Sequence, residues 1–410
     1  MLKMLNRNAR MVLQFETVGA FASVVITFFA SLYMSSSGLS GGQIGLINMV
    51  AFVSSFLCQL IAIPIVDRIG RKATILWFTF TAWSIPLLIW IFMPNFLGFL
   101  IGYTIYGTGR ITFIGWYYSM TEDALEEEKP MIFGTLFLIN SLVGGLTFFI
   151  GMLVGENVFS VLRIIYIIGF FLLTALAIVR HFFVTETFVG QRILAEKRPF
   201  QPGKQFLSQI RLMFSLFKNA RIACSTLLYV CSNLLAAVAF IQPLFANQIL
   251  NMPILMVSSI PALTALLCVV LFFVFVRRLP AGTHWKVFAF SSILYGGLAL
   301  LLLLCAKTVP ILGIIVLGLM GGVLYIMQVT SNSTLNFITG EDLSRLLGAV
   351  QGLTLLITAP FAWLLGKLFD IWSFLPFILI AALCVLGVLT ALINTFHPVQ
   401  KPSDEAAKTT

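Results

Sequence analysis

Two ionisable residues, Glu16 and Arg110, lie inside long apolar stretches of the chain and could do chemistry there. A charge in the middle of an apolar span costs between about 2.5 and 17 kcal/mol unless it is paired or solvated. Arg110, near the centre of the stretch 96–120, therefore predicts a water-filled cavity or a partner carboxylate. It could bind a substrate anion, belong to a proton-coupling pair or form a purely structural ion pair.

Glu16 lies one to two helical turns inside the first apolar stretch, 11–34, and is the only acidic residue that we expect within such a stretch. A buried carboxylate can exchange protons near neutral pH. A Glu16–Arg110 pair could then free the arginine for an anion when the carboxylate takes up a proton. Alternatively, Glu16 reaches the edge of the stretch and is simply solvated.

Other polar side chains also interrupt the apolar stretches. They are Tyr103, Tyr106 and Tyr117 near the Arg110 face, Asn140, Tyr229, Asn233, Gln242, Tyr325, Gln328 and Asn332. Polar groups that face lipid are expensive, so most of these should point inward. Each one could be a helix–helix hydrogen bond. Together they predict a mixed aromatic and polar cavity, suited to an amphipathic or modestly polar solute.

A polar loop between the second and third apolar stretches carries a charged motif. It reads Asp67, Arg68, Ile69, Gly70, Arg71 and Lys72. Gly70 permits a turn too tight for a side chain. Asp67 can face a helix N-terminus and a neighbouring arginine, which would hold one side of the protein closed in one state and release it in another. Alternatively, these charges only anchor helix ends.

This loop resembles the signature loop of the major facilitator superfamily, whose pattern is G-x-x-x-D-R-x-G-R-R/K. Five pattern positions match, and Ile63 stands in place of the first glycine. The resemblance implies two six-helix bundles that rock about a central site. It also implies that an acidic residue after helix four, Glu122 or Asp123, joins the latch. Glu186-Thr187 resembles, weakly, the family's Pro-Glu-Thr ending of helix six. The family's R-x-x-x-G signature is matched only loosely, since Gly115 follows Arg110 at a spacing of five.

The amino-acid composition indicates the kind of secondary structure that holds these residues in place. Of the 410 residues, 60% are hydrophobic and only 10% are charged, with a mean hydropathy of +1.03. These are too few charges for a soluble surface, so we predict an all-α membrane protein. A spanning helix needs about 20 apolar residues. Twelve spans are predicted: 11–34, 44–66, 73–93, 96–120, 131–154, 161–183, 220–247, 253–276, 287–306, 309–334, 345–368 and 374–396.

The basic residues are distributed unevenly between the two sides of these spans. Of the 25 Lys and Arg residues, 21 fall on the side of the N-terminus, Arg180 among them. Only Arg163, Lys307 and Lys367 fall on the other side. Positive charge marks the cytoplasmic side, so both termini are predicted to be cytoplasmic. The net charge of +10 is thus explained by membrane orientation and predicts no nucleic-acid partner.

The longest polar break divides the chain into two halves. We predict an N-terminal six-helix bundle at 1–184, a cytoplasmic linker at 185–219, a C-terminal bundle at 220–396 and a tail at 397–410. In the linker, Phe206, Ile210, Phe214 and Phe217 share one helical face. That spacing predicts an amphipathic helix on the membrane surface.

The sequence favours a secondary transporter over other classes. It has no nucleotide-binding GxxxxGK[ST] loop and no HExxH zinc motif, and no cysteine pair of the CxxC type. We therefore expect no cofactor, no metal and no enzymatic activity. The leading hypothesis is a monomeric, proton-coupled transporter in the plasma membrane that exports amphipathic drug-like or metabolite solutes. The alternatives are a proton-coupled importer of an organic anion or sugar, and a lipid flippase.

Overall fold

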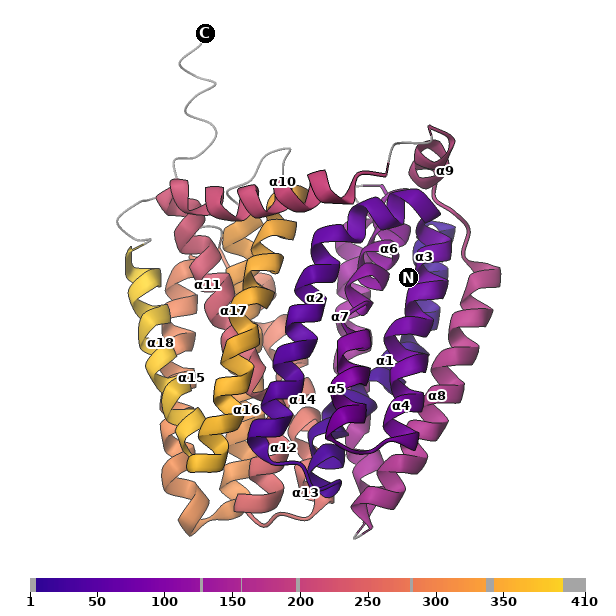
Figure 1. The fold of residues 1–410 in the computed structure, drawn as a ribbon. Helices are drawn as coiled ribbons and strands as arrows, with labels where there is room; N and C mark the ends of the chain where they lie inside the picture. Colours follow the sequence, from indigo (N-terminus) through magenta and orange to yellow (C-terminus); the bar gives the residue numbers. More distant parts are fainter. Residues whose placement is uncertain are drawn as a thin grey trace.

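The computed structural model describes residues 5–125, 128–155, 157–196, 200–280, 283–336 and 343–393, so the predicted tail lies outside the described residues. These ranges contain helices, turns and loops, and no strand is assigned within them. Long helices stand side by side, and α10 lies across one end of them (Figure 1). We name the end that carries α9 and α10 the linker face, and the opposite end the far face.

The first half of the chain forms α1 to α8. Their bounds are α1 Arg7–Ser36, α2 Gly41–Ile69, α3 Arg71–Thr79, the π turn η2 Phe80–Ser84, α4 Ile85–Phe92, α5 Phe96–Tyr106, α6 Gly109–Thr121, α7 Lys129–Val154 and α8 Val158–Phe183. The linker follows, with α9 Phe188–Ala195, α10 Pro202–Ser215 and the 3-10 turn η3 Leu216–Lys218.

The second half begins with α11. The bounds are α11 Ala220–Ala236, η4 Ala237–Phe240, α12 Gln242–Leu244, η5 Phe245–Ile249, α13 Ile254–Val257, α14 Ser259–Val274, η6 Val276–Arg278, α15 His284–Thr308, α16 Pro310–Asn336, α17 Leu343–Ile371 and α18 Leu375–Ile393.

Every predicted span coincides with one helix or with a run of consecutive helices. Ten runs of described helix are long and apolar enough to cross a membrane. The predicted span 96–120 is split between α5 and α6, and α7 contributes a shorter apolar helix, Leu142–Val154. The chain is an all-α membrane protein, and the total of twelve crossings and their orientation stay predictions.

Two prolines account for irregular turns inside the spans. The π turn η2 comes just before Pro86, and η5 follows Pro243. Proline lacks an amide hydrogen, so the hydrogen-bond ladder must shift around it. The break between α5 and α6 has a different cause from the two proline turns. Gly107 lies against Ser54 of α2, where a β-carbon would overlap the serine, and Ser54 Oγ donates to the Thr104 carbonyl at 2.6 Å.

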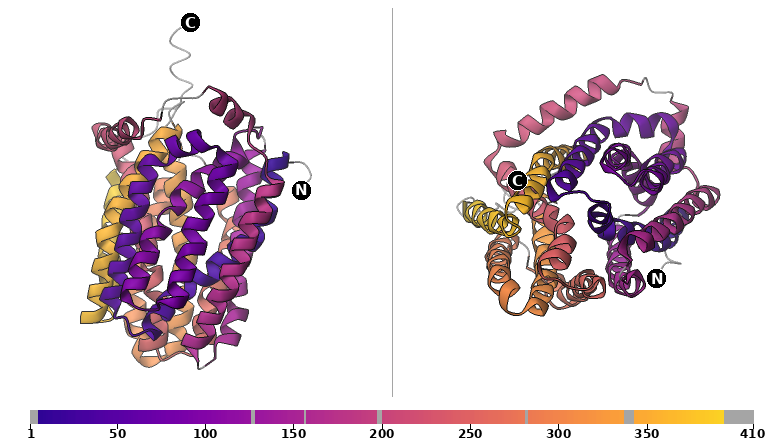
Figure 2. Two further views of the ribbon diagram at one scale, coloured as in Figure 1. Left: turned by 45° about the vertical axis from the view of Figure 1, so that its right-hand side comes forward. Right: turned by 60° about the horizontal axis from the view of Figure 1, so that its bottom comes forward.

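The two halves lie beside each other (Figure 2), and α2 of the first half and α17 of the second approach closely at the far face. There α2 crosses α17 with almost no side chain between them, because a β-carbon on Gly45 would lie 2.8 Å from the Ala362 carbonyl. The Gly42 amide donates to Asp370 Oδ2 at 2.7 Å, which joins the start of α2 to the end of α17. Small residues let membrane helices approach this closely.

A single apolar core bridges the halves near this face. It includes Phe29 and Tyr33 of α1 together with Phe245 of η5 and Phe377 of α18, all fully buried. The rings of Phe245 and Phe377 are 4.7 Å apart. Because this core is shared by both halves, it closes the space between them toward the far face.

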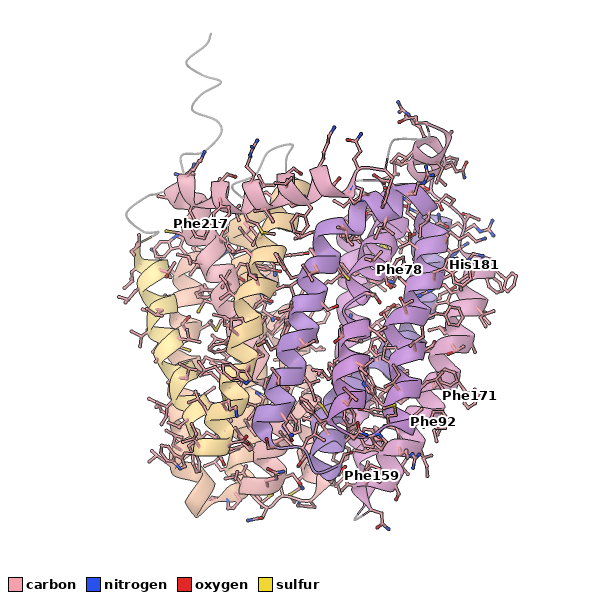
Figure 3. All side chains as sticks on the ribbon, viewed as in Figure 1. Phe78, Phe92, Phe159, Phe171, His181 and Phe217 are labelled. Atoms are coloured by element: carbon pink, nitrogen blue, oxygen red, sulfur yellow. The ribbon has the colours of Figure 1, made fainter. Side chains whose placement is uncertain are left out.

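The linker helix α10 packs across the opposite end of the molecule, at the linker face. It packs on α2 and α17, and Met213 is buried against Gly352. Phe206 and Ile210 are half-buried in the same contact, whereas Phe214 and Phe217 are exposed (Figure 3). Three of the four predicted residues lie in α10, and Phe217 lies in the 3-10 turn that follows it. The position of this helix on a membrane surface stays a prediction.

Candidate functional site

Arg110 lies in a central cavity of about 370 Å³ between the two halves. It comes from the first turn of α6, directly after the break at Gly107. Opposite it stand Tyr229 and Asn233 of α11 and Gln351 of α17. Arg110 makes no ion pair with any described residue, and its electrostatic neighbours are the hydroxyl groups of Tyr229 and Tyr106. A cation without a counter-carboxylate is suited to hold an anionic group.

Tyr106 belongs to an aromatic cluster on the far-face side of Arg110. Its ring lies 5.2 Å from that of Trp83 and 5.9 Å from that of Tyr103. Trp90 packs against the same group, with its ring centroid 4.8 Å from that of Tyr103. These rings surround a smaller cavity of about 140 Å³. Aromatic walls beside a single cation suit an amphipathic solute with an anionic or electron-rich end.

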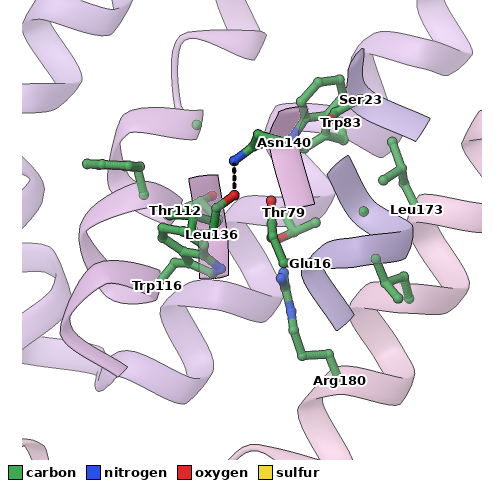
Figure 4. A pocket seen from close by; sticks show the side chains of 14 residues that line it. Glu16, Ser23, Thr79, Trp83, Thr112, Trp116, Leu136, Asn140, Leu173 and Arg180 are labelled. Carbon is green, nitrogen blue, oxygen red and sulfur yellow. Dashed lines mark hydrogen bonds between the residues drawn. The ribbon is translucent and has the colours of Figure 1, made fainter. Parts of the chain in front are cut away.

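Glu16 lies in a second cavity of about 340 Å³ inside the first half, which we name the N-bundle cavity (Figure 4). Arg180 of α8 and Trp116 of α6 line it with Glu16, and Asn140 of α7 stands on another side. The charged group that acts on Glu16 is Arg180. The predicted Glu16–Arg110 pair is therefore wrong, because the two side chains enter different cavities. Phe113 of α6 lines both cavities and separates them.

Arg180 is a cavity residue that the sequence reasoning missed. Counting it with the basic residues of the cytoplasmic side placed it at a membrane edge, but its side chain is only 6% exposed. Helical spacing could have revealed it. The buried residues of α8 recur every three or four positions, and Arg180 continues that stripe: Leu162, Tyr166, Gly169, Leu173, Ala177 and Arg180. Such a stripe marks the face of a helix that packs inward.

The charged loop forms a compact network around Arg71, whose side chain is 1% exposed. Its Nε and Nη2 donate to the Glu122 carboxylate at 3.0 and 2.7 Å. Its Nη1 lies 3.1 Å from Asp67 Oδ1, and its guanidinium covers the Tyr118 ring at 5.3 Å. A bidentate arginine–carboxylate pair is among the strongest polar contacts. These contacts tie the loop to the ends of α2 and α6.

Glu186 and Thr187 complete this network, although their sequence signal was weak. The Glu186 carboxylate accepts hydrogen bonds from the amides of Arg71 and Lys72, at 2.9 and 3.1 Å, and so caps the start of α3. Thr187 donates to Glu122 and caps α9 through the Gly190 amide. A carboxylate at a helix N-terminus is favourable because unpaired amides and the helix dipole both attract it.

Gly70 allows this cap to form. Its φ of +89° lies in the region that disfavours side chains. A β-carbon here would also lie 2.6 Å from Glu186 Oε2. Two independent constraints therefore favour glycine at this position. The first pattern position, Ile63, is half-buried and packs with Ala62 and Val66 against α6.

The two acidic residues after α6 have different surroundings. Glu122 binds Arg71, whereas the Asp123 carboxylate accepts from the Phe188 amide at 3.1 Å. Burial raises the pKa of the Asp123 carboxyl, although the Phe188 amide opposes this. Arg68 is exposed. Each contact described for this network lies within the first half and the beginning of the linker.

The remaining predicted site residues lie outside these two cavities. Tyr117 is 38% exposed beside Tyr118, and Gln242 lies in α12 near the far face. Tyr325, Gln328 and Asn332 follow one another along α16, where the Asn332 amide donates to the Gln328 carbonyl at 2.8 Å. Their polar character within a predicted span had suggested that they face inward. Polar side chains project from a helix in several directions, and only the packing of the helix decides which of them face the site.

The described residues contain no group of three or more His, Cys, Asp or Glu side chains placed to hold a metal ion. Cys58, Cys224, Cys231, Cys268 and Cys384 are free thiols in the described part of the chain.

Comparison with known proteins agrees with this architecture. A family model described as Major Facilitator Superfamily matches residues 17–342. No curated protein sequence matched the chain. Among solved structures, the nucleoside transporter NupG is similar with a TM-score of 0.69 at 15% identity, covering 95% of this chain and 99% of that one.

Two further structures show the same fold. The human organic anion transporter MFSD10 (TETRAN) has a TM-score of 0.60 at 15% identity, with 93% of this chain and 99% of that chain covered. A POT family transporter in complex with 5-aminolevulinic acid has a TM-score of 0.69 at 11% identity, with 97% and 99% covered. The match over most of the chain, the two helical halves and the Asp67–Lys72 loop together show that this protein belongs to the Major Facilitator Superfamily of membrane transporters.

Proposed function

We propose that this protein is a proton-coupled secondary transporter that moves an amphipathic solute with an anionic group by alternating access. The observation that carries this proposal is Arg110. It stands in a central cavity lined by both halves, beside aromatic rings and without a carboxylate partner among the described residues. A site between two rocking halves is where alternating access requires the solute to bind.

An organic anion fits this cavity better than a sugar or a lipophilic cation. A cation would meet Arg110 with like charge, and a sugar would leave the guanidinium uncompensated in a poorly solvated space. The aromatic surface favours a drug-like or metabolite anion over an inorganic one, and export is the direction that we expect for such solutes.

Glu16 is the proposed proton-coupling residue. It is the acidic residue of the N-bundle cavity, and Phe113 places that cavity next to the Arg110 site. A carboxylate in such a place can gain and lose a proton as the cavity changes sides. The Arg71 network is the proposed latch of the linker face, and we expect a monomer in the plasma membrane.

The flippase alternative would need an apolar groove that opens sideways to lipid. One such groove of about 550 Å³ lies on the outer surface between α4 and α8, where Phe92 and Phe171 face outward (Figure 3). Its lining comes from the first half alone. Alternating access needs a site between the halves, so we favour the Arg110 cavity as the transport site.

Uptake into proteoliposomes driven by a pH gradient tests this function. The solutes would be a panel of aromatic carboxylates, lipophilic cations and sugars. We expect only anions to move and the pH gradient to dissipate with them. Arg110→Ala should reduce anion transport about 10- to 100-fold, because a charge-assisted hydrogen bond contributes about 1.5–3 kcal/mol. Arg110→Lys should retain part of it.

Arg192→Gln, on exposed α9 and outside the charged loop, provides a matched control for loss of a positive charge in the anion-binding step. Transport of cations at a rate that Arg110→Ala leaves unchanged would refute the anion-anchor proposal. Anion transport that ignores the pH gradient would refute proton coupling and leave Arg110 as an anchor.

A further inference from the structure

The N-bundle cavity contains hydrogen-bond donors that the fold leaves unused. Arg180 Nε, Trp116 Nε1 and Thr112 Oγ1 are buried and have no hydrogen-bond partner among the described residues. The side chains of Arg180 and Trp116 are 6% and 8% exposed, and all three residues line the cavity. A buried donor without a partner costs about 1–3 kcal/mol. Such donors are expected where a ligand or water completes the site.

Glu16 faces these donors without closing on them. Arg180 acts on Glu16 electrostatically, but the two side chains form no direct ion pair. Trp116 Nε1 lies close to the Glu16 carboxyl but misses hydrogen-bond geometry. Arg180 is instead held in place by its Nη2, which donates to Thr79 Oγ1 at 3.0 Å. The cation is therefore positioned while its Nε stays available.

The cavity has room for a small organic ion and polar groups on several sides. Its volume is about 340 Å³. Asn140 lines it from α7, and its amide donates to the Leu136 carbonyl at 3.0 Å (Figure 4). Leu173 and Leu176 of α8 provide apolar wall. Donors on one side and aliphatic carbon on another suit a small carboxylate with a short apolar body.

From this geometry we propose that the N-bundle cavity is a second anion site, which binds a small carboxylate together with a proton on Glu16. Arg180, Trp116 and Thr112 donate to the carboxylate oxygens. Ionised Glu16 would repel the ligand, whereas protonated Glu16 donates its own hydrogen to it. One proton and one carboxylate therefore enter together, and the cavity charge is unchanged. This proposal rests on the proposed function only for its role in coupling, because binding itself can be measured without transport.

The charges around Glu16 support this coupling. Arg180 of α8 is the charged residue that acts on it, while α3 contributes Thr79, α6 contributes Trp116 and α7 contributes Asn140 to the cavity. The guanidinium of Arg180 therefore balances mainly one negative charge, that of the ligand, and Glu16 has to be neutralised by its own proton. Affinity for a carboxylate should rise as the pH falls, by up to about tenfold for each pH unit over the range in which Glu16 takes up its proton.

Equilibrium binding of radiolabelled benzoate to the full-length protein in nanodiscs tests this at pH 5 to 8. The Arg110→Gln background removes the central site, so any remaining binding reports the N-bundle cavity. We expect saturable binding that strengthens toward acid pH. Adding Glu16→Gln should make binding nearly independent of pH, since the amide resembles the protonated carboxyl. Adding Arg180→Gln should abolish it at every pH.

Three variants keep the test decisive. Thr112→Val keeps the side-chain shape and should weaken binding severalfold even if Arg180→Gln folds poorly. Arg180→Lys keeps the charge and should restore part of the binding. Arg192→Gln, on exposed α9, should behave as its parent. Three results would each overturn the proposal. They are no benzoate binding, binding that is independent of pH in the protein that retains Glu16, and binding that survives Arg180→Gln. Transport failure with pH-linked binding intact would refute the proposed function and leave this site standing.

Discussion

Arg71 shows most clearly how one residue organises the linker face. Its guanidinium satisfies Glu122 and Asp67 at once while almost fully buried. Arg71→Gln would leave two carboxylates close together without their cation, and breaking a buried pair costs about 3–5 kcal/mol. We expect a clear fall in the melting temperature of the purified protein. Arg68→Gln, close to it along the chain but exposed, should change the unfolding free energy by no more than about 0.5 kcal/mol.

The Arg71 result has a clear contrary outcome. Equal melting temperatures for the two variants would mean that the network contributes no stability in this state. Loss of transport at unchanged melting temperature would assign Arg71 a purely functional role.

At the scale of elements, the start of α3 depends on Glu186, which follows α8 and caps the first amides of α3. Gly70→Ala should destabilise by the strain of a positive φ and also by displacing Glu186. Gly38 separates these two effects. Its φ is +88°, and a β-carbon added there would meet no atom within 4 Å. Gly38→Ala should therefore cost only the backbone strain, about 1–2 kcal/mol. Chemical denaturation measures the free energy of unfolding of both variants. We expect Gly38→Ala to be the more stable by about 1 kcal/mol, which is the contribution of the cap that Gly70→Ala loses.

Much of the element scale was predictable from the sequence, and the missed features share a cause. Long apolar runs predicted the spans within a few residues, because each span must satisfy its own backbone hydrogen bonds. The Asp67–Lys72 motif predicted a charged contact between α2 and the end of α6, which the Arg71 network contains. Glu186 was undervalued because its amide partners belong to α3, more than a hundred positions earlier in the chain. Arg180 was missed because a charge near a span end usually reaches the surface.

At the scale of the whole molecule, the far-face crossing of α2 and α17 should control which side opens. Gly366→Ala would force a β-carbon into the Gly41 carbonyl, and Asp370→Ala would remove the cap on α2. Both should favour opening of the far face. Asp370→Ala should shift the ratio of states by about fivefold, for a loss of about 1 kcal/mol. Gly366→Ala should shift it further.

Labelling of an Asn233→Cys reporter in the central cavity measures this shift. An impermeant maleimide added on the far-face side should react faster in both variants, with native cysteines replaced by serine. Gly297→Ala is the matched glycine control, since its β-carbon meets no atom within 4 Å. Unchanged labelling in Gly366→Ala would show that this crossing does not limit far-face opening.

The sequence by itself determined the membrane class, the positions of the spans, the division into halves and the charged loop. Each of these follows from local composition, because apolar length and the charges between spans are written along the chain. The tertiary structure alone decided the charge partners. It separated Glu16 from Arg110, placed Glu16 and Arg180 in the same N-bundle cavity and brought Tyr229 and Gln351 opposite Arg110. Which buried charges share a cavity depends on helix rotation and packing, which no single stretch of sequence encodes.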